Sequence, residues 1–267
     1  MQRKGLPVGV GLAAAAALCS LVSSAQTQAG VRILENRHST VFAEKMTFEL
    51  VAEHDEGING VTLYYRRQRE RVTSRVVPEF TPGRRVEARY EKTLERGEIP
   101  PGTVIEYYWR LELADGSHFD TDTHTFAYED DRFDWQTLSA DKVTILYYGG
   151  KREAERAQEL AERGKETLAR LQNEVGVTLE APVRVYVYRD AADMGAALSP
   201  RSQGFDERIL TLGIAVAEDT LLLLGNHPDV QQTLAHELSH IVVGLATKNP
   251  YAPLPRWLDE GLAMYAE

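Results

Sequence analysis

Between residues 31 and 130, apolar and polar side chains alternate along the chain with a period of two. The clearest apolar runs are Met46, Phe48, Leu50 and Ala52; Val61, Leu63 and Tyr65; Val86, Ala88 and Tyr90; and Ile105, Tyr107, Trp109, Leu111 and Leu113. This alternation is typical of strands with one buried face. The runs are separated by turn-forming segments, "DEGING", "TPGR", "IPPG" and "ADGS". The pattern predicts an antiparallel β-sandwich domain over residues 31–130.

After residue 142 the period changes. "KVTILYY" and "PVRVYVYR" are typical of strands, and the apolar positions between them, from Ala157 to Val175, follow one face of a helix. Two further strands, "ILTLGIAVA" and "DTLLLLG", precede a helix over about 229–245, and another helix is expected to begin near Pro255. This order predicts an α+β domain over 143–267.

The segment 131–142 is charged and lacks a long apolar stretch, so it is the candidate linker between the two domains. Trp135 within it is expected to pack at the junction. The first domain contains no cysteine pair, and its likeness to immunoglobulin or fibronectin-like modules is one of architecture only.

The first 25 residues differ in composition from the rest of the chain. A short basic start precedes an uncharged apolar run, and Ser23 and Ala25 supply small residues for a cleavage site. This predicts a signal peptide over residues 1–25, with an uncleaved membrane anchor as the alternative. Cleavage would remove Cys19, the single cysteine, so a metal would have to be held by His, Asp or Glu. The expected location is extracytoplasmic, secreted or associated with a bacterial cell envelope.

Charge and composition restrict the classes of partner. With 43% hydrophobic and 26% charged residues, the chain has an ordinary globular balance. Its formal net charge of −10 argues against binding to nucleic acid or anionic lipid, which requires clustered Lys and Arg. Membrane association is therefore expected only through an uncleaved signal or a C-terminal anchor outside this sequence. No pattern indicates an oligomeric state.

The helix over 229–245 carries the candidate chemistry, in the stretch "TLAHELSHIVVGLA". His236 and His240 are four residues apart, so both imidazoles leave one face of the helix and can converge on one cation. Glu237 projects away from His236 and can lie beside a metal-bound water. This is an H-E-x-x-H arrangement. The alternative is a pair of buried histidines that carboxylates satisfy.

A second motif, "WLDEGLA" at 257–263, follows the first. Together they resemble the gluzincins, particularly the peptidase MA-like zinc metallopeptidases and, more distantly, membrane-alanyl-type aminopeptidases with a W-L-x-E-G-x-A pattern. The resemblance implies a zincin-like domain over 143–267 and assigns the third zinc ligand to Glu260. Asp259 is adjacent, but neighbouring helix residues point about 100° apart, so only one of the two can face the histidines. Glu260 is favoured by the motif, by its longer side chain, and because Gly261 would permit close helix approach.

Two further residues receive weaker roles. Asp259 is expected either to orient a ligand imidazole through its free ring N–H or to be a solvated acid in the first helical turn. The resemblance implies an additional group that stabilises the oxyanion, and Tyr265 is a candidate for it, with a packed helix aromatic as the alternative. The chain stops seven residues after Glu260, so the zincin-like domain is expected to be incomplete at its C-terminus.

The expected function is an exported peptidase with one zinc ion held by His236, His240 and Glu260. Glu237 would be the general base for water attacking a peptide or protein substrate. The alternative is a non-catalytic envelope binding or adhesion module with a structural or degenerate zinc site. The segment 219–225 immediately precedes the metal-bearing helix, and we expect it to be the edge strand with which an extended substrate pairs, a central core strand being the alternative.

Overall fold

The computed structural model describes most of the chain, namely residues 27–28, 30–68, 70–198, 213–217, 219–247 and 254–267. The predicted signal peptide, residues 1–25, lies outside the described residues. Among the helices in the described parts, none combines the length and the apolar character needed to cross a membrane.

The N-terminal region is one antiparallel sheet of eight strands. Its strands are β1 (Thr27–Gln28), β2 (Val31–Val41), β3 (Lys45–Arg67), β4 (Ser74–Val76), β5 (Gly83–Thr93), β6 (Thr103–Leu113), β7 (His118–Asp120) and β8 (His124–Tyr128). The first half of β3 pairs with β2 and β5, and its second half pairs with β4 and β6. The predicted antiparallel arrangement is confirmed, but the strands form one continuous sheet and not the two separate sheets of the predicted sandwich.

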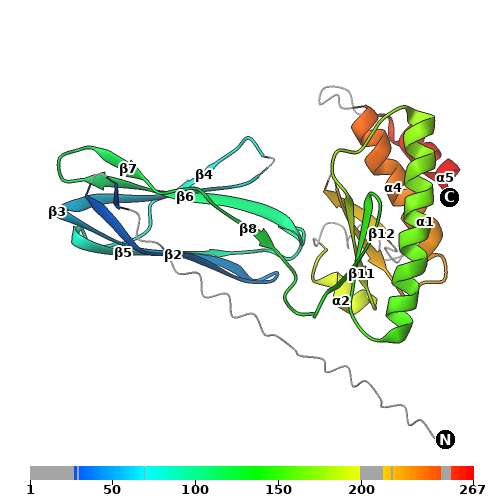
Figure 1. Ribbon diagram of the computed structural model, residues 1–267, viewed down its shortest axis with the longest axis horizontal. Helices are drawn as coiled ribbons and strands as arrows, with labels where there is room; N and C mark the ends of the chain where they lie inside the picture. The colour runs from blue at the N-terminus through cyan, green and yellow to red at the C-terminus, as the bar shows by residue number, and fades with distance from the viewer. Residues whose placement is uncertain (1–26, 29, 69, 199–212, 218, 248–253) are drawn as a thin grey trace, which may run out of the picture.

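This sheet folds over on itself as a half-barrel because β3 changes direction in its middle. The pairing register shifts between Glu53 and Ile58, and Gly57 adopts a φ of 107°, which favours glycine. The ring of Phe48 in the first half of β3 stacks on Tyr65 in the second half, with centroids 5.4 Å apart. Figure 1 shows the two layers that result, and the alternating apolar side chains of both halves are buried.

The C-terminal region is a mixed α/β arrangement. Its elements are β9 (Gln136–Ala140), β10 (Val143–Tyr147), α1 (Lys151–Val175), β11 (Val183–Tyr188), α2 (Ala191–Gly195), β12 (Gly213–Ala217), β13 (Thr220–Leu224), α4 (Val230–Ala246) and α5 (Arg256–Ala266). The sheet order is β12-β13-β11-β10-β9. Strands β10, β11 and β13 are parallel, with an antiparallel strand at each end, so the region differs from the predicted α+β unit. Helices α1 and α4 pack on one face of the sheet through a shared apolar core.

Two features of this sheet differ from the sequence-based expectations. The segment 219–225 was expected to be the substrate-pairing edge strand, and this is wrong, because β13 is paired with β11 on one side and β12 on the other. Its four leucines are fully buried, as in a central strand. In addition, the candidate linker 131–142 contains β9, which pairs with β10.

The half-barrel packs against the face of the sheet opposite α1 and α4 (Figure 1). The hydroxyl of Tyr186 donates to Glu129 at 2.6 Å, and that of Tyr188 donates to the fully buried Asp130 at 2.8 Å. Arg132 binds both oxygens of Asp130 at 2.8 and 2.6 Å. Trp135 contacts the rings of both tyrosines, which confirms its expected position at the junction. Polar and aromatic contacts therefore hold the two regions together.

Candidate metal centre

Helix α4 places two imidazoles side by side at the sheet. Leu234, Leu238 and Val242 are fully buried against the sheet and α1, which fixes the rotation of the helix. His236 and His240 therefore leave a neighbouring face, where their side chains are 21% and 20% exposed. Their ring centroids lie 4.9 Å apart. The two imidazoles are accessible to an ion and held by a buried helix.

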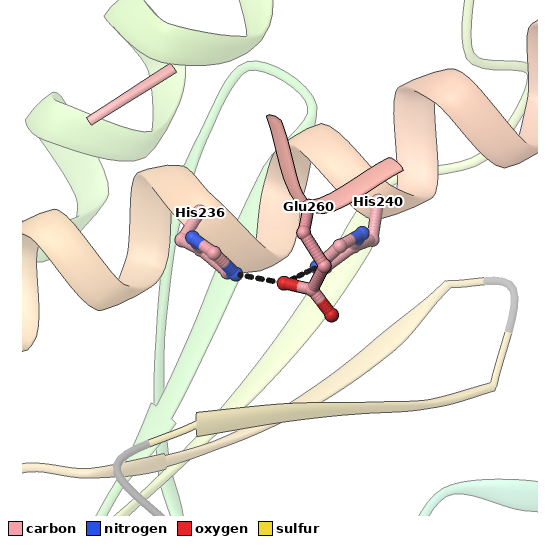
Figure 2. A group of neighbouring side chains, drawn as sticks. All are labelled: His236, His240 and Glu260. Atoms are coloured by element: carbon pink, nitrogen blue, oxygen red, sulfur yellow. Dashed lines mark ion pairs between the residues drawn. The ribbon is translucent and has the colours of Figure 1, made fainter. Parts of the chain in front are cut away.

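Helix α5 brings Glu260 to the same point. Its Oε2 lies 3.5 Å from His236 Nε2 and 4.0 Å from His240 Nε2, as Figure 2 shows. The three ligand atoms all lie within 4.8 Å of one another. Tetrahedral zinc with bonds of about 2.0–2.2 Å separates its ligand atoms by about 3.4 Å. The distances and the donor set, two imidazoles and a carboxylate, therefore fit a single zinc ion.

The contact between α5 and α4 does not depend on Gly261, and the expectation that this glycine permits close helix approach is wrong. A Cβ added to Gly261 would meet no described atom within 4 Å, and the residue is exposed. Ala263 and Ala266 are instead fully buried. Small residues do allow the approach, but they lie further along the helix.

The remaining ring nitrogens of both histidines face carboxylates. Asp259 Oδ2 lies 3.1 Å from His240 Nδ1, and Glu267 Oε1 lies 2.9 Å from His236 Nδ1. A carboxylate at Nδ1 favours the tautomer that leaves Nε2 free to bind a metal. The sequence analysis had named Asp259 for such a contact. It had not named Glu267, because no motif connects the end of α5 with α4.

Glu237 points from α4 toward β12. The backbone N–H of Ala215 donates to its Oε2 at 3.1 Å. Burial raises the pKa of the Glu237 carboxyl, while the imidazoles of His240 and His236 and the Ala215 N–H act in the opposite direction. The Glu237 carboxyl is thus partly desolvated and lies beside the two histidines.

Gly213 makes the close approach of β12 to α4 possible. A Cβ at this position would lie 2.6 Å from Thr233 Cγ2, 2.7 Å from Leu223 Cδ2 and 3.1 Å from Glu237 Cγ. The sequence analysis had not singled out this residue, although a glycine inside a strand pattern is a signal of close backbone approach.

Tyr265 takes a different direction from the other named residues. It lies five positions after Glu260, which corresponds to about 140° of rotation around the helix. The Tyr265 ring lies 6.0 Å from the guanidinium of Arg170 on α1, and Tyr265 is 70% exposed. The structure thus brings together His236, His240 and Glu260, with Glu237 and Asp259 beside them, and directs Tyr265 toward α1.

The family model of the peptidase MA superfamily matches residues 163–267. This match confirms the resemblance carried by the two motifs and implies a metallopeptidase. Among curated proteins, no sequence matches this chain significantly.

Several solved structures are similar to parts of the chain. The carbohydrate binding module of the muscle glycogen-targeting subunit of Protein Phosphatase-1 shares 12% identity at a TM-score of 0.29, over 38% of this chain and 76% of that chain. Catalytically inactive OgpA from Akkermansia muciniphila, in complex with an O-glycopeptide substrate, shares 12% identity at a TM-score of 0.27, over 41% of this chain and 32% of that chain. Purple acid phosphatase PPD1 from yellow lupin (Lupinus luteus) seeds shares 10% identity at a TM-score of 0.28, over 57% of this chain and 28% of that chain. The chain thus spans about a third of the length of OgpA and less of PPD1.

Proposed function

We propose that the protein is a zinc-dependent peptidase that hydrolyses peptide bonds with Glu237 as the general base. The observation that carries this proposal is the convergence of one ligand atom each from His236, His240 and Glu260 within 4.8 Å of one another. The superfamily match over residues 163–267 supports the same function independently of the geometry.

The residues fit one zinc ion, which His236, His240 and Glu260 would hold. Three protein ligands leave a further position for water or substrate, which is typical of catalytic rather than structural sites. When bound, zinc supplies a Lewis acid and lowers the pKa of a water molecule toward neutrality.

Glu237 performs the proton transfers in this proposal. It accepts a proton from the attacking water and passes it to the departing amine nitrogen. The Ala215 N–H holds Oε2 of Glu237, which leaves Oε1 for the water. The raised pKa of this carboxyl suits a group that must both take and release a proton near neutral pH.

Asp259 and Glu267 act as positioning residues. The Glu267 carboxylate accepts the Nδ1 proton of His236 at 2.9 Å, and the Asp259 carboxylate lies 3.1 Å from Nδ1 of His240. These contacts fix the orientation of both rings before an ion arrives, so the site needs little rearrangement on binding.

The substrate binds along β12 rather than β13. Among the described residues, β12 pairs with β13 on one side only, and the N–H of Ala215 on its other side is the one that contacts Glu237. An extended peptide that adds to this free edge through main-chain hydrogen bonds would bring a peptide bond close to Glu237.

The remaining parts of the chain complete the proposal. Residues 1–25 carry the composition of a signal peptide, and we place the protein outside the cytoplasm, secreted or at the bacterial cell envelope. We relate the half-barrel to immunoglobulin or fibronectin-like modules through its antiparallel strands and alternating core, although its eight strands form one sheet and not two.

The test is cleavage of a quenched-peptide library by purified protein, with and without a chelator. The proposal expects zinc-dependent cleavage that Glu237→Gln reduces by about a hundredfold to ten-thousandfold, as removal of an acid–base group does. Glu162→Gln, a surface change on α1, is the matched control and should retain activity. Stoichiometric zinc without turnover in the wild type would instead favour the non-catalytic binding module.

A further inference from the structure

A cavity lies between the half-barrel and the mixed sheet. Its volume is about 340 Å³, within the range of roughly 300–1,000 Å³ typical of ligand pockets. The half-barrel contributes the loop after β3 and the start of β6, and the mixed sheet contributes the ends of β11, β12 and β13. Its lining includes Arg67, Gln68, Glu70, Arg184, Val216 and Asp219.

This cavity begins one residue along β12 from the residue whose N–H contacts the candidate catalytic base. Ala215 contacts Glu237, and the next residue, Val216, lines the cavity. Successive strand residues are about 3.3 Å apart. A peptide that pairs with the free edge of β12 next to Glu237 would therefore reach the cavity within one or two residues.

Side-chain direction also favours this arrangement. Ala215 packs toward the core of α1 and α4, whereas Ile214 and Val216 pack toward the core that includes the half-barrel. Side chains of a strand added to β12 would alternate in the same way. Every second side chain of such a peptide would then point to the side on which the cavity lies.

The half-barrel side of the cavity is firmly attached. The N–H of Gln68 donates to Val104 O at 2.9 Å, and Arg67 Nη2 donates to Glu98 O at 2.7 Å. Across the junction, Arg184 Nη1 donates to Gly102 O at 2.6 Å. The last of these contacts joins the two sides of the cavity.

We propose that the half-barrel forms one wall of the substrate groove and selects among substrates by contacting one side chain of an extended polypeptide. This inference rests on the proposed function. The loop residues Gln68 and Glu70 are exposed, and Glu70 pairs with Arg67 at 3.1 Å. Two arginines and two carboxylates, those of Glu70 and Asp219, line the cavity, so its charge is balanced. The occupant is therefore an uncharged side chain of an extended polypeptide.

The experiment uses the full-length zinc-loaded protein and a set of quenched octapeptides in which Ser, Lys or Glu occupies each position in turn. We compare the wild type with Glu70→Lys, and with Glu87→Lys as the matched charge reversal on β5, where the glutamate side chain is 69% exposed. Glu70→Lys should raise kcat/KM for the Glu peptide relative to the Lys peptide by about fivefold at one position only, the size of one partly screened ion pair. Glu87→Lys should leave all ratios unchanged. Binding of the same peptides to Glu237→Gln, measured by fluorescence anisotropy, should show the same change in preference without chemistry.

The two proposals fail in different ways. If Glu70→Lys changes neither the cleavage preference among the peptides nor their binding in the Glu237→Gln background, the half-barrel does not form a wall of the substrate groove. The proposed peptidase function would be unaffected by that result. Absence of Glu237-dependent cleavage of any peptide by the wild type would overturn the proposed function, and the inference with it.

Discussion

Replacing Gly213 with alanine tests whether the close approach of β12 to α4 positions the catalytic carboxylate. The added Cβ would lie 2.6 Å from Thr233 Cγ2 and 2.7 Å from Leu223 Cδ2. Ordinary carbon contacts are about 3.5–4.0 Å, so either these two buried side chains would have to move by roughly 1 Å or β12 would have to move away from α4. Such overpacking costs about 1–3 kcal/mol, and the smaller entropy of the unfolded alanine chain offsets less than about 1 kcal/mol of it.

The same separation would weaken the hydrogen bond from Ala215 to Glu237, which is already 3.1 Å long. A misplacement of about 1 Å can reduce turnover by roughly a hundredfold. We therefore expect Gly213→Ala to lower the free energy of unfolding in urea by about 1–2 kcal/mol. We also expect it to lower kcat strongly while zinc stoichiometry stays at that of the wild type, because the three ligands do not contact Gly213.

Gly244→Ala is the matched control. Gly244 lies in α4, and a Cβ there would meet no described atom within 4 Å. Alanine is a better helix former than glycine by about 1 kcal/mol, so this variant should be as stable as the wild type or more so, with unchanged kcat. If both variants unfold at the same urea concentration and cleave peptides equally fast, the close packing at Gly213 is not what positions Glu237.

Three further predictions concern the ligands, the junction and α5. Glu260→Gln should remove most of the bound zinc after gel filtration, whereas Asp259→Asn should retain it with a lower affinity, by about 10–100-fold; the opposite pattern in metal analysis would assign the third ligand to Asp259. Burial, and then the Asp130 carboxylate, raise the pKa of Tyr188, so its folded-state pKa lies above the unfolded value of about 10. The resulting contribution to the free energy of unfolding is complete below about pH 10 and is lost as the pH rises further. In urea unfolding between pH 8 and 11, the free energy of unfolding should therefore fall more steeply above about pH 10 for the wild type than for Tyr188→Phe. Parallel curves would contradict the assignment. Gly261→Ala should raise the melting temperature slightly, because the added Cβ meets no described atom and alanine favours the helix, whereas a loss of stability would mean that α5 does approach another element there.

Much of the fold could be predicted from local patterns. The alternation of Met46, Phe48, Leu50 and Ala52 specifies a strand with one buried face, and all four side chains are buried as expected. The spacing of His236 and His240 specifies a shared helix face in the same way. Such features need information only from neighbouring positions in the chain.

The pairing of strands could not be predicted in this way. The leucines of β13 make a strand that is buried on both faces, but they do not say which strands lie beside it. Proximity in sequence to α4 suggested an edge, whereas β12, which comes just before β13 in the chain and pairs antiparallel with it, occupies that edge. The contact of Glu267 with His236 was likewise invisible, because it depends on how α5 packs.

The buried junction has a consequence for the order in which the protein folds. Tyr186 and Tyr188 on β11 find their hydrogen-bond acceptors, Glu129 and Asp130, at the end of the half-barrel. Those acceptors precede β11 in the chain, so during synthesis the half-barrel can be complete before β11 leaves the ribosome. The finished half-barrel then offers a surface onto which the parallel strands assemble. A polypeptide that began at residue 143 would expose both tyrosines to solvent and would lose that template.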